Sequence, residues 1–96
     1  MRFAWDPNKA AKNLKKHGVD FREAATIFDD TLSTSFADPD HSVGEARFLT
    51  IGVSKLLRIL VVAHTESGDT IRIISARPAT RRERWSYAEE DDYNSQ

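Results

Sequence analysis

The chain has 96 residues, of which 40% are hydrophobic and 30% charged, and its formal net charge at neutral pH is -1. This length allows one domain with a single modest core, and the composition excludes a disordered or fibrous protein. The absence of cysteine excludes disulfide bonds and thiolate chemistry. The longest apolar run, residues 59–63, is too short to cross a bilayer, and the N-terminus lacks the apolar stretch of a signal peptide. These features predict a cytoplasmic protein without membrane association.

Charge is unevenly distributed along the chain. Residues 1–28 carry a net charge of +3 and residues 29–45 a net charge of -5, while residues 71–87 carry +4 and residues 88–96 carry -4. Such alternating blocks fit a nearly neutral protein that presents a basic cleft to RNA or DNA. The same blocks fit equally well a protein whose surface charges form ion pairs with one another, so charge alone leaves both interpretations open.

A strand and a helix are predicted at the N-terminus. Residues 2–5 alternate polar and apolar side chains, which is typical of a short strand. Asp6 suits a helix N-cap, and Pro7 suits the first helical position, where its missing N–H costs nothing. The helix should run to about residue 17, because Gly18 is a natural C-terminal stop.

A second helix should follow almost at once. Asp20 and Glu23 have the spacing of a capping box, which predicts a helix over residues 21–28. Residues 31–37 are rich in strand-forming side chains, and the acidic stretch 38–45 has the turn chemistry of an exposed loop.

Three further strands and a helix complete the predicted fold. Strands are expected over residues 46–53, 56–66 and 70–77, and their short links favour an antiparallel meander. Thr80 and Glu83 form a second capping box, which starts a C-terminal helix whose acidic end, residues 88–96, is expected to fray. The predicted fold is therefore α+β, in the order β-α-α-β-β-β-β-α, with an antiparallel sheet of about four to five strands.

Assumed hairpin turns predict which side chains share a face of the sheet. Two-residue loops at 54–55 and 67–68 would place Arg47 opposite Val62 and Arg58 opposite Arg77. Since opposed residues share a face, one face would then carry four basic side chains, namely Arg47, Arg58, His64 and Arg77. The other face would be covered by the two N-terminal helices and would be apolar except for Arg72, which points away from Arg77 in a regular strand. Its apolar side chains would be those of Phe48, Leu57, Ile59, Val61, Ala63 and Ile74.

The junction between the last strand and the last helix is the candidate chemical site. Backbone N–H groups at a helix start favour anions, and Arg77 just before it offers a planar, two-pronged donor for a phosphate. The alternative interpretation is structural: Arg77 and Glu83 would form a salt bridge that braces the turn.

Three segments together make the chain recognisable. They are FAWDPNKAAKNLKKHGVDFREAATIF at residues 3–28, TESGDTIRI at residues 65–73, and RIISARPATRRER at residues 72–84 with Tyr87 shortly after. In this order they resemble the BrnT family of type II toxins. The resemblance implies a RelE-like fold over residues 1–96 and metal-independent cleavage of RNA that stops translation. It also implies a partner, a ribbon-helix-helix antitoxin of the BrnA type. The toxin would bind operator DNA only as part of a complex with this antitoxin.

Site residues follow from the resemblance and from the chemistry of RNA scission. The resemblance implies that the family's site residues correspond to Arg47, Arg77 and Glu83 in this sequence. We expect the two arginines to stabilise the charged transition state, with Glu83, His64 or Tyr87 sharing proton transfer. RNA binding is expected of the remaining basic and aromatic side chains around the junction, namely Arg58, Arg81, Arg82 and Trp85. No cofactor is expected, and the histidines at positions 17, 41 and 64 lack the spacing of a metal site.

Two non-catalytic alternatives remain open at this point. The arginine surface could be bound by an acidic or amphipathic segment of another protein. Alternatively, the chain could be a small nucleic-acid-binding or corepressor module.

Overall fold

The computed structural model describes residues 1–38 and 44–94, with side chains up to residue 88. Its elements appear in the predicted order and confirm the α+β fold. They are β1 (Arg2–Ala4), α1 (Pro7–His17), α2 (Phe21–Ala25), the 3-10 helix η1 (Thr26–Asp29), β2 (Thr34–Ala37), β3 (Arg47–Val53), β4 (Ile59–Ser67), β5 (Thr70–Pro78) and α3 (Arg81–Asn94). The predicted loop at 38–45, with His41, lies largely outside the described residues.

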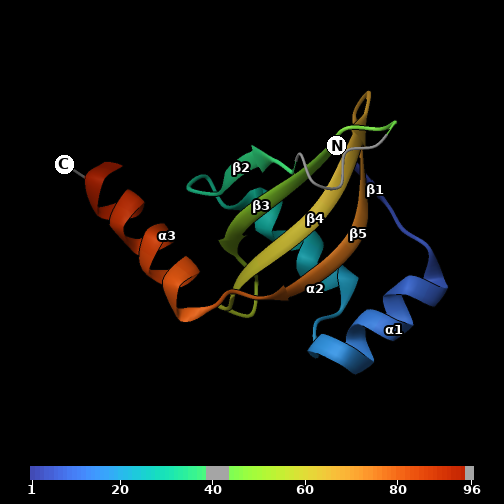
Figure 1. Ribbon diagram of the computed structural model, residues 1–96, viewed down its shortest axis with the longest axis horizontal. Helices are drawn as coiled ribbons and strands as arrows, with labels where there is room; N and C mark the ends of the chain where they lie inside the picture. Colours follow the sequence, from blue (N-terminus) through green and yellow to red (C-terminus); the bar gives the residue numbers. More distant parts are fainter. Residues whose placement is uncertain (39–43, 95–96) are drawn as a thin grey trace.

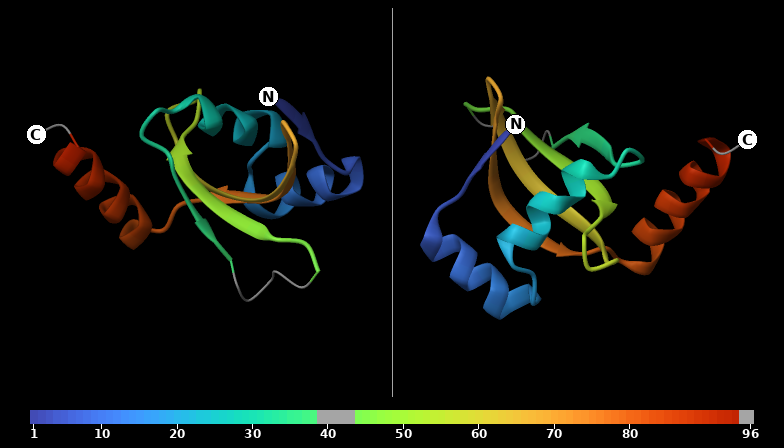
Figure 2. Two further views of the ribbon diagram at one scale, coloured as in Figure 1. Left: turned by 90° about the horizontal axis from the view of Figure 1, so that it is seen from above. Right: turned by 180° about the vertical axis from the view of Figure 1, so that it is seen from behind.

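The five strands form one sheet in the order β1-β5-β4-β3-β2. Neighbouring strands are antiparallel except β1 and β5, which pair in parallel. Figures 1 and 2 show α1 and α2 on one face of the sheet, which we call the inner face. α3 lies at the opposite end of the molecule from α1 and projects away from the sheet. No helix in the described part of the chain is long and apolar enough to span a membrane.

The predicted ends of α1 are confirmed. The Asp6 side chain accepts a hydrogen bond from the Asn8 N–H at 2.8 Å, and Pro7 occupies the first turn. Gly18 ends the helix with a φ of 69°, and its N–H donates to the Leu14 carbonyl. This left-handed conformation is open to glycine at little cost, so the stop is encoded locally.

The second helix is shorter than predicted. Asp20 is its N-cap, accepting from the Arg22 N–H at 2.7 Å, but the helix becomes a 3-10 turn after Ala25. Glu23 is buried and does not complete the capping box, because its carboxylate contacts Ser54 and Arg58 instead. A tertiary ion pair has thus replaced a local contact.

The core lies between the inner face and the two N-terminal helices. One polar side chain is built into it: the Asn13 amide exchanges two hydrogen bonds with the Ala76 backbone of β5 and donates a third to the Val19 carbonyl. The buried cluster consists of Val19, Phe21, Ala24, Ile27, Leu60, Val62, Ile71, Ile73 and Ala76. Burial of this apolar surface is the main force that holds α1 and α2 to the sheet.

The predicted strand register is wrong in both hairpins. Arg47 pairs with Thr65 instead of Val62, because β4 begins only at residue 59 and the turn is longer than two residues. In the other hairpin Arg77 pairs with Val61, and a β-bulge beside Ala63 and His64 shifts the register by one. An odd shift transfers side chains to the other face of a sheet.

These shifts redistribute the four basic side chains that were predicted to share a face. Arg47 and Arg77 do lie together on the face away from the helices, the outer face, because both pair with odd-numbered β4 residues. His64 belongs to the inner face, and Arg58 lies in the turn before β4. The face that α1 and α2 cover contains Leu60 and Val62, whereas the predicted one contained Val61.

Candidate functional site

Arg77 and Glu83 form a two-pronged ion pair at the β5–α3 junction. Arg77 Nη1 donates to Glu83 Oε1 at 2.7 Å, and Nη2 donates to Oε2 at 2.9 Å. The side chains remain 39% and 27% exposed, so solvent and small anions can reach the pair. The salt bridge between Arg77 and Glu83, which was the structural alternative in the sequence analysis, is therefore present.

A complete capping box fixes Glu83 from the other side. Its carboxylate accepts from the Thr80 N–H at 2.8 Å, while its own N–H donates to Thr80 Oγ1 at 3.2 Å. The hydrogen bonds from Arg77 outweigh burial and lower the pKa of Glu83 to about 2, and the same pair raises the pKa of Arg77. At neutral pH Glu83 is therefore ionised and a weak base while it is paired.

A second group of cations lies further along the outer face. Arg47 on β3 and Arg72 on β5 both pair with Thr65 of β4 and so flank it on either side. The prediction that Arg72 points away from Arg77 is wrong, because the β-bulge lies between them. Arg72 is exposed, and its position beside Thr65 could not be predicted from the sequence. Thr65 is four residues along β4 from Val61, the partner of Arg77. At the normal rise of a strand the two positions are roughly 13 Å apart.

Tyr87 is engaged with Asp30. Its hydroxyl donates to Asp30 Oδ2 at 2.5 Å, and the same oxygen accepts from the Val53 N–H at 2.9 Å. Burial alone would raise the pKa of Asp30, but the hydrogen bonds from Tyr87, Val53 and Leu32 lower it overall. The Tyr87 hydroxyl thus points to a carboxylate and not to the Arg77–Glu83 pair.

His64 is a core residue. It is 0% exposed, and its ring packs against Phe28 and Phe48. Nε2 lies 2.7 Å from Thr50 Oγ1, while the buried Nδ1 has no hydrogen-bond partner in the described structure. Burial lowers the pKa of His64, and Glu66 only partly offsets it. In this conformation no substrate reaches the ring, so we leave His64 out of the proposed site.

Arg58, predicted to bind RNA, is held by the buried carboxylate of Glu23. Its Nε donates to Glu23 Oε2 at 2.9 Å, and Nη2 donates to Glu23 Oε1 and to the Gly18 carbonyl. The pair lowers the pKa of Glu23 and raises that of Arg58. This guanidinium braces the β3–β4 turn against the N-terminal helices.

The start of α3 presents the remaining predicted RNA contacts to solvent. Arg81 and Arg82 are exposed, and Trp85 is 73% exposed. Arg84 differs, because its Nη1 donates to the Ala79 carbonyl at 2.9 Å. Arg81, Arg82 and Trp85 are thus available to a ligand near the Arg77–Glu83 pair.

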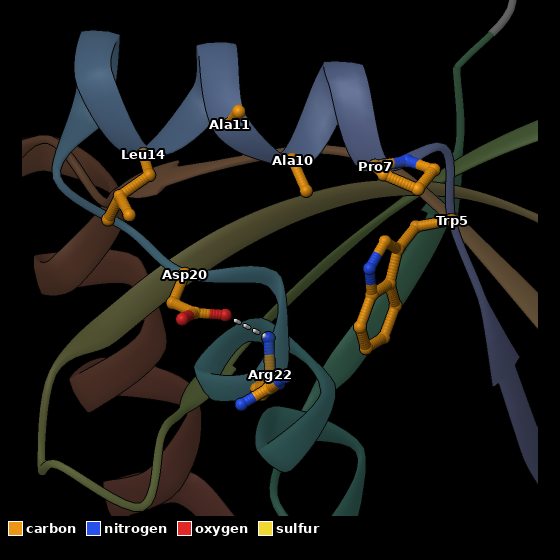
Figure 3. A pocket seen from close by; sticks show the side chains of 7 residues that line it. All are labelled: Trp5, Pro7, Ala10, Ala11, Leu14, Asp20 and Arg22. Atoms are coloured by element: carbon orange, nitrogen blue, oxygen red, sulfur yellow. Dashed lines mark hydrogen bonds between the residues drawn. The ribbon is translucent and has the colours of Figure 1, made fainter.

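A groove of about 310 Å³ lies between α1 and the start of α2, on the inner side of the molecule. Figure 3 shows Trp5, Ala10 and Leu14 along its α1 side, with Asp20 and Arg22 opposite. Both apolar and charged side chains line it, and it is separate from the arginines of the outer face. Among the described residues, no group of three or more His, Cys, Asp or Glu side chains could hold a metal ion.

Residues 5–83 match the model of the family described as ribonuclease toxin, BrnT, of type II toxin-antitoxin system. The chain belongs to this family. The match ends at Glu83, so it includes the Arg77–Glu83 pair and excludes most of α3.

A solved structure supports the assignment. The chain is similar to the crystal structure of the Brucella abortus ribonuclease toxin, BrnT, with 26% sequence identity and a TM-score of 0.66. The similarity covers 84% of this chain and 99% of that one. A comparison with curated proteins gives no match. Membership in a type II toxin–antitoxin family implies an antitoxin partner.

Proposed function

We propose that this BrnT-family protein is an endoribonuclease that cleaves RNA without a metal ion and thereby inhibits translation in the cytoplasm. Family membership and the position of Arg77 support this proposal. Arg77 presents a planar pair of donors at a partly exposed junction, which is the geometry that a phosphate needs.

Exchange of partners by Arg77 would activate the site. A phosphate of the RNA competes with Glu83 for the guanidinium, and once Arg77 turns to the phosphate, Glu83 loses the contact that contributes most to its low pKa. Its carboxylate then becomes a stronger base at the position where the substrate binds. Separation of the ion pair thus yields a base, Glu83, and a cation, Arg77, that act on the same phosphate group and its neighbouring 2′-OH.

The reaction is an internal transfer within the RNA. Glu83 takes the proton of the 2′-OH, the 2′ oxygen bonds to phosphorus, and the bond to the 5′ oxygen breaks. The products are a 2′,3′-cyclic phosphate and a 5′-hydroxyl, with water supplying the proton for the leaving oxygen. Arg77 stabilises the negative charge that develops on the phosphoryl oxygens.

Arg47 and Arg72 would hold a neighbouring part of the same strand. They lie on the outer face with Arg77 but four positions away along β4, which suits a phosphate other than the one that Arg77 binds. Arg81, Arg82 and Trp85 at the start of α3 would add phosphate contacts and a stacking surface.

We further propose that the antitoxin is a ribbon-helix-helix protein of the BrnA type. It would neutralise the toxin by covering the same arginines, and only their complex would bind operator DNA. Copurification of this chain with the product of an adjacent reading frame, followed by loss of RNA cleavage in the complex, is the direct test.

Cleavage of RNA in excess chelator tests the catalytic proposal. Wild-type protein should cut, Arg77→Ala should cut at least about a hundredfold more slowly, and Arg22→Ala, which removes an exposed arginine from α2, should behave as wild type. An RNA with a 2′-deoxy sugar at the cut site should resist cleavage. Cutting of that substrate at the normal rate contradicts the mechanism, and no cutting by wild-type protein favours a non-catalytic binding module.

A further inference from the structure

Few of the described side chains of α3 pack against the rest of the protein. Of its described side chains, from Arg81 to Ala88, none is buried and only Glu83 and Tyr87 are partly buried. These two residues are four positions apart and so lie on the same side of the helix. Figures 1 and 2 show the rest of α3 projecting away from the sheet.

Both side chains contact the body of the protein. Glu83 binds Arg77 at the end of β5, and Tyr87 donates to Asp30 between η1 and β2. A small apolar cavity of about 130 Å³ beside Tyr87, lined also by Thr34, Phe36, Ile51 and Ser86, shows that packing under this turn is incomplete. The hydrogen bond from Tyr87 to Asp30 is therefore a main contact between α3 and the rest of the protein.

Asp30 is a rigid acceptor. Its Oδ1 accepts from the Leu32 N–H and its Oδ2 from the Val53 N–H, both at 2.9 Å, so the carboxylate is fixed before Tyr87 approaches. A hydrogen bond from a neutral hydroxyl to such a carboxylate is among the stronger kinds in proteins. Since Asp30 is tied to the end of β3 and the start of the β2 segment, Tyr87 connects α3 to the far side of the sheet from β5.

The Arg77–Glu83 pair braces only the start of the helix. Because both side chains are partly exposed, solvent screens the attraction between them, and a second contact further along α3 is needed to fix its direction. If Tyr87 is released, α3 can pivot about residues 78–80, and Glu83 then moves relative to Arg77.

We propose that Asp30 is a positioning residue for the site: by holding the Tyr87 hydroxyl, it keeps α3 where Glu83 faces Arg77. This inference rests on the proposed ribonuclease function and assigns Tyr87 a role other than proton transfer. It explains why a hydroxyl on α3 and a carboxylate 57 residues away in the chain are placed in direct contact.

Tyr87→Phe tests the inference, because it removes the hydroxyl and keeps the ring. Titration of Glu83, followed by NMR of its carboxyl carbon, reports how well it is paired with Arg77. In wild-type protein the pKa is about 2; in Tyr87→Phe we expect it to rise by about one unit or more. Ser86→Ala, which removes an exposed hydroxyl beside the same cavity and keeps the contact between Tyr87 and Asp30, should leave the titration of Glu83 as in wild type.

Cleavage kinetics and a second variant complete the test. Tyr87→Phe should lower kcat/KM for RNA about tenfold. Asp30→Asn should shift the Glu83 titration in the same direction, and the double variant should show no more than the larger single effect. An unchanged Glu83 titration in Tyr87→Phe, or additive shifts in the double variant, overturns the inference. Because the titration requires no RNA, it decides the matter even if wild-type protein proves not to cleave RNA.

Discussion

The side chain of Asn13 and the backbone of Ala76 are joined by two hydrogen bonds across 63 residues of sequence. Asn13 Nδ2 donates to the Ala76 carbonyl at 2.8 Å, and the Ala76 N–H donates to Asn13 Oδ1 at 3.0 Å. The amide thus takes the place of a neighbouring strand beyond the end of β1, which pairs with β5 only at residues 70–72. Since Ala76 precedes Arg77, α1 fixes the strand position from which the arginine extends.

Asn13→Ala should destabilise the protein by about 3 kcal/mol, because it leaves the buried backbone groups of Ala76 and Val19 without partners. Denaturant unfolding measures the change. Asn8→Ala, on the exposed side of the same helix, should cost much less. A loss of less than about 1 kcal/mol in Asn13→Ala would mean that water replaces the amide.

Arg58→Met should weaken the fold and leave RNA binding unchanged. Removal of the guanidinium leaves the Glu23 carboxylate, only 6% exposed, without its charged partner, and we expect a loss of about 2 kcal/mol, since solvent screens the 38% exposed arginine.

Unfolding and RNA-binding measurements on Arg58→Met separate this role from the predicted RNA contact. Glu23→Gln in the same background should recover part of the stability, because no unpaired charge then remains. Weaker RNA binding by a fully folded Arg58→Met would show that the arginine contacts RNA as well.

His64 should make the protein sensitive to acid. Its pKa is lowered in the folded state by burial, so the unfolded chain binds a proton more readily than the folded one. Stability from this residue is therefore present above its ordinary pKa of about 6.5 and is lost as the pH falls below that value. The fully buried ring faces Glu66 at 3.8 Å, and this carboxylate reduces the effect without reversing it.

Unfolding free energies of wild type and His64→Gln between about pH 7.5 and pH 5 measure this contribution. The variant should be less stable at neutral pH, because it disturbs the contact with Thr50, but its stability should fall less steeply toward acid. Parallel curves for the two proteins would show that another group controls the acid response.

The sequence predicted those features of the fold that depend on neighbouring residues. Asp6 and Gly18 end α1 as predicted, and Thr80 with Glu83 starts α3, because caps act within one turn of helix. Glu23 shows the limit of such reasoning. It has the spacing of a capping box, but a buried contact with Arg58, 35 residues away, replaces the local one.

The faces of the sheet could not be predicted, because they depend on single-residue shifts in register. The turn before β4 and the bulge at Ala63 and His64 leave no clear mark in the sequence, yet together they bury His64 and bring Arg72 onto the outer face. Arg77 and Glu83 were identified because they lie close to one junction. Asp30 was not, since its partner Tyr87 is distant in the chain.

Arg72→Ala should weaken RNA binding without affecting the chemical step. Arg72 is exposed on the outer face and flanks Thr65 opposite Arg47, so it can neutralise a phosphate that lies away from the Arg77–Glu83 pair. Loss of one such contact should reduce the slope of log affinity against log salt by about 0.7 for single-stranded RNA. KM should rise while kcat stays close to the wild-type value, because the contact is the same in ground state and transition state.

The matched control is Arg22→Ala, which removes another exposed arginine, from α2 on the side away from the outer face. It should leave both the salt slope and KM at their wild-type values. Equal effects of the two substitutions would indicate that overall charge, and not the outer face, attracts RNA. A fall in kcat for Arg72→Ala would instead place this arginine at the scissile phosphate, which requires the substrate to lie closer to Thr65 than to the α3 junction.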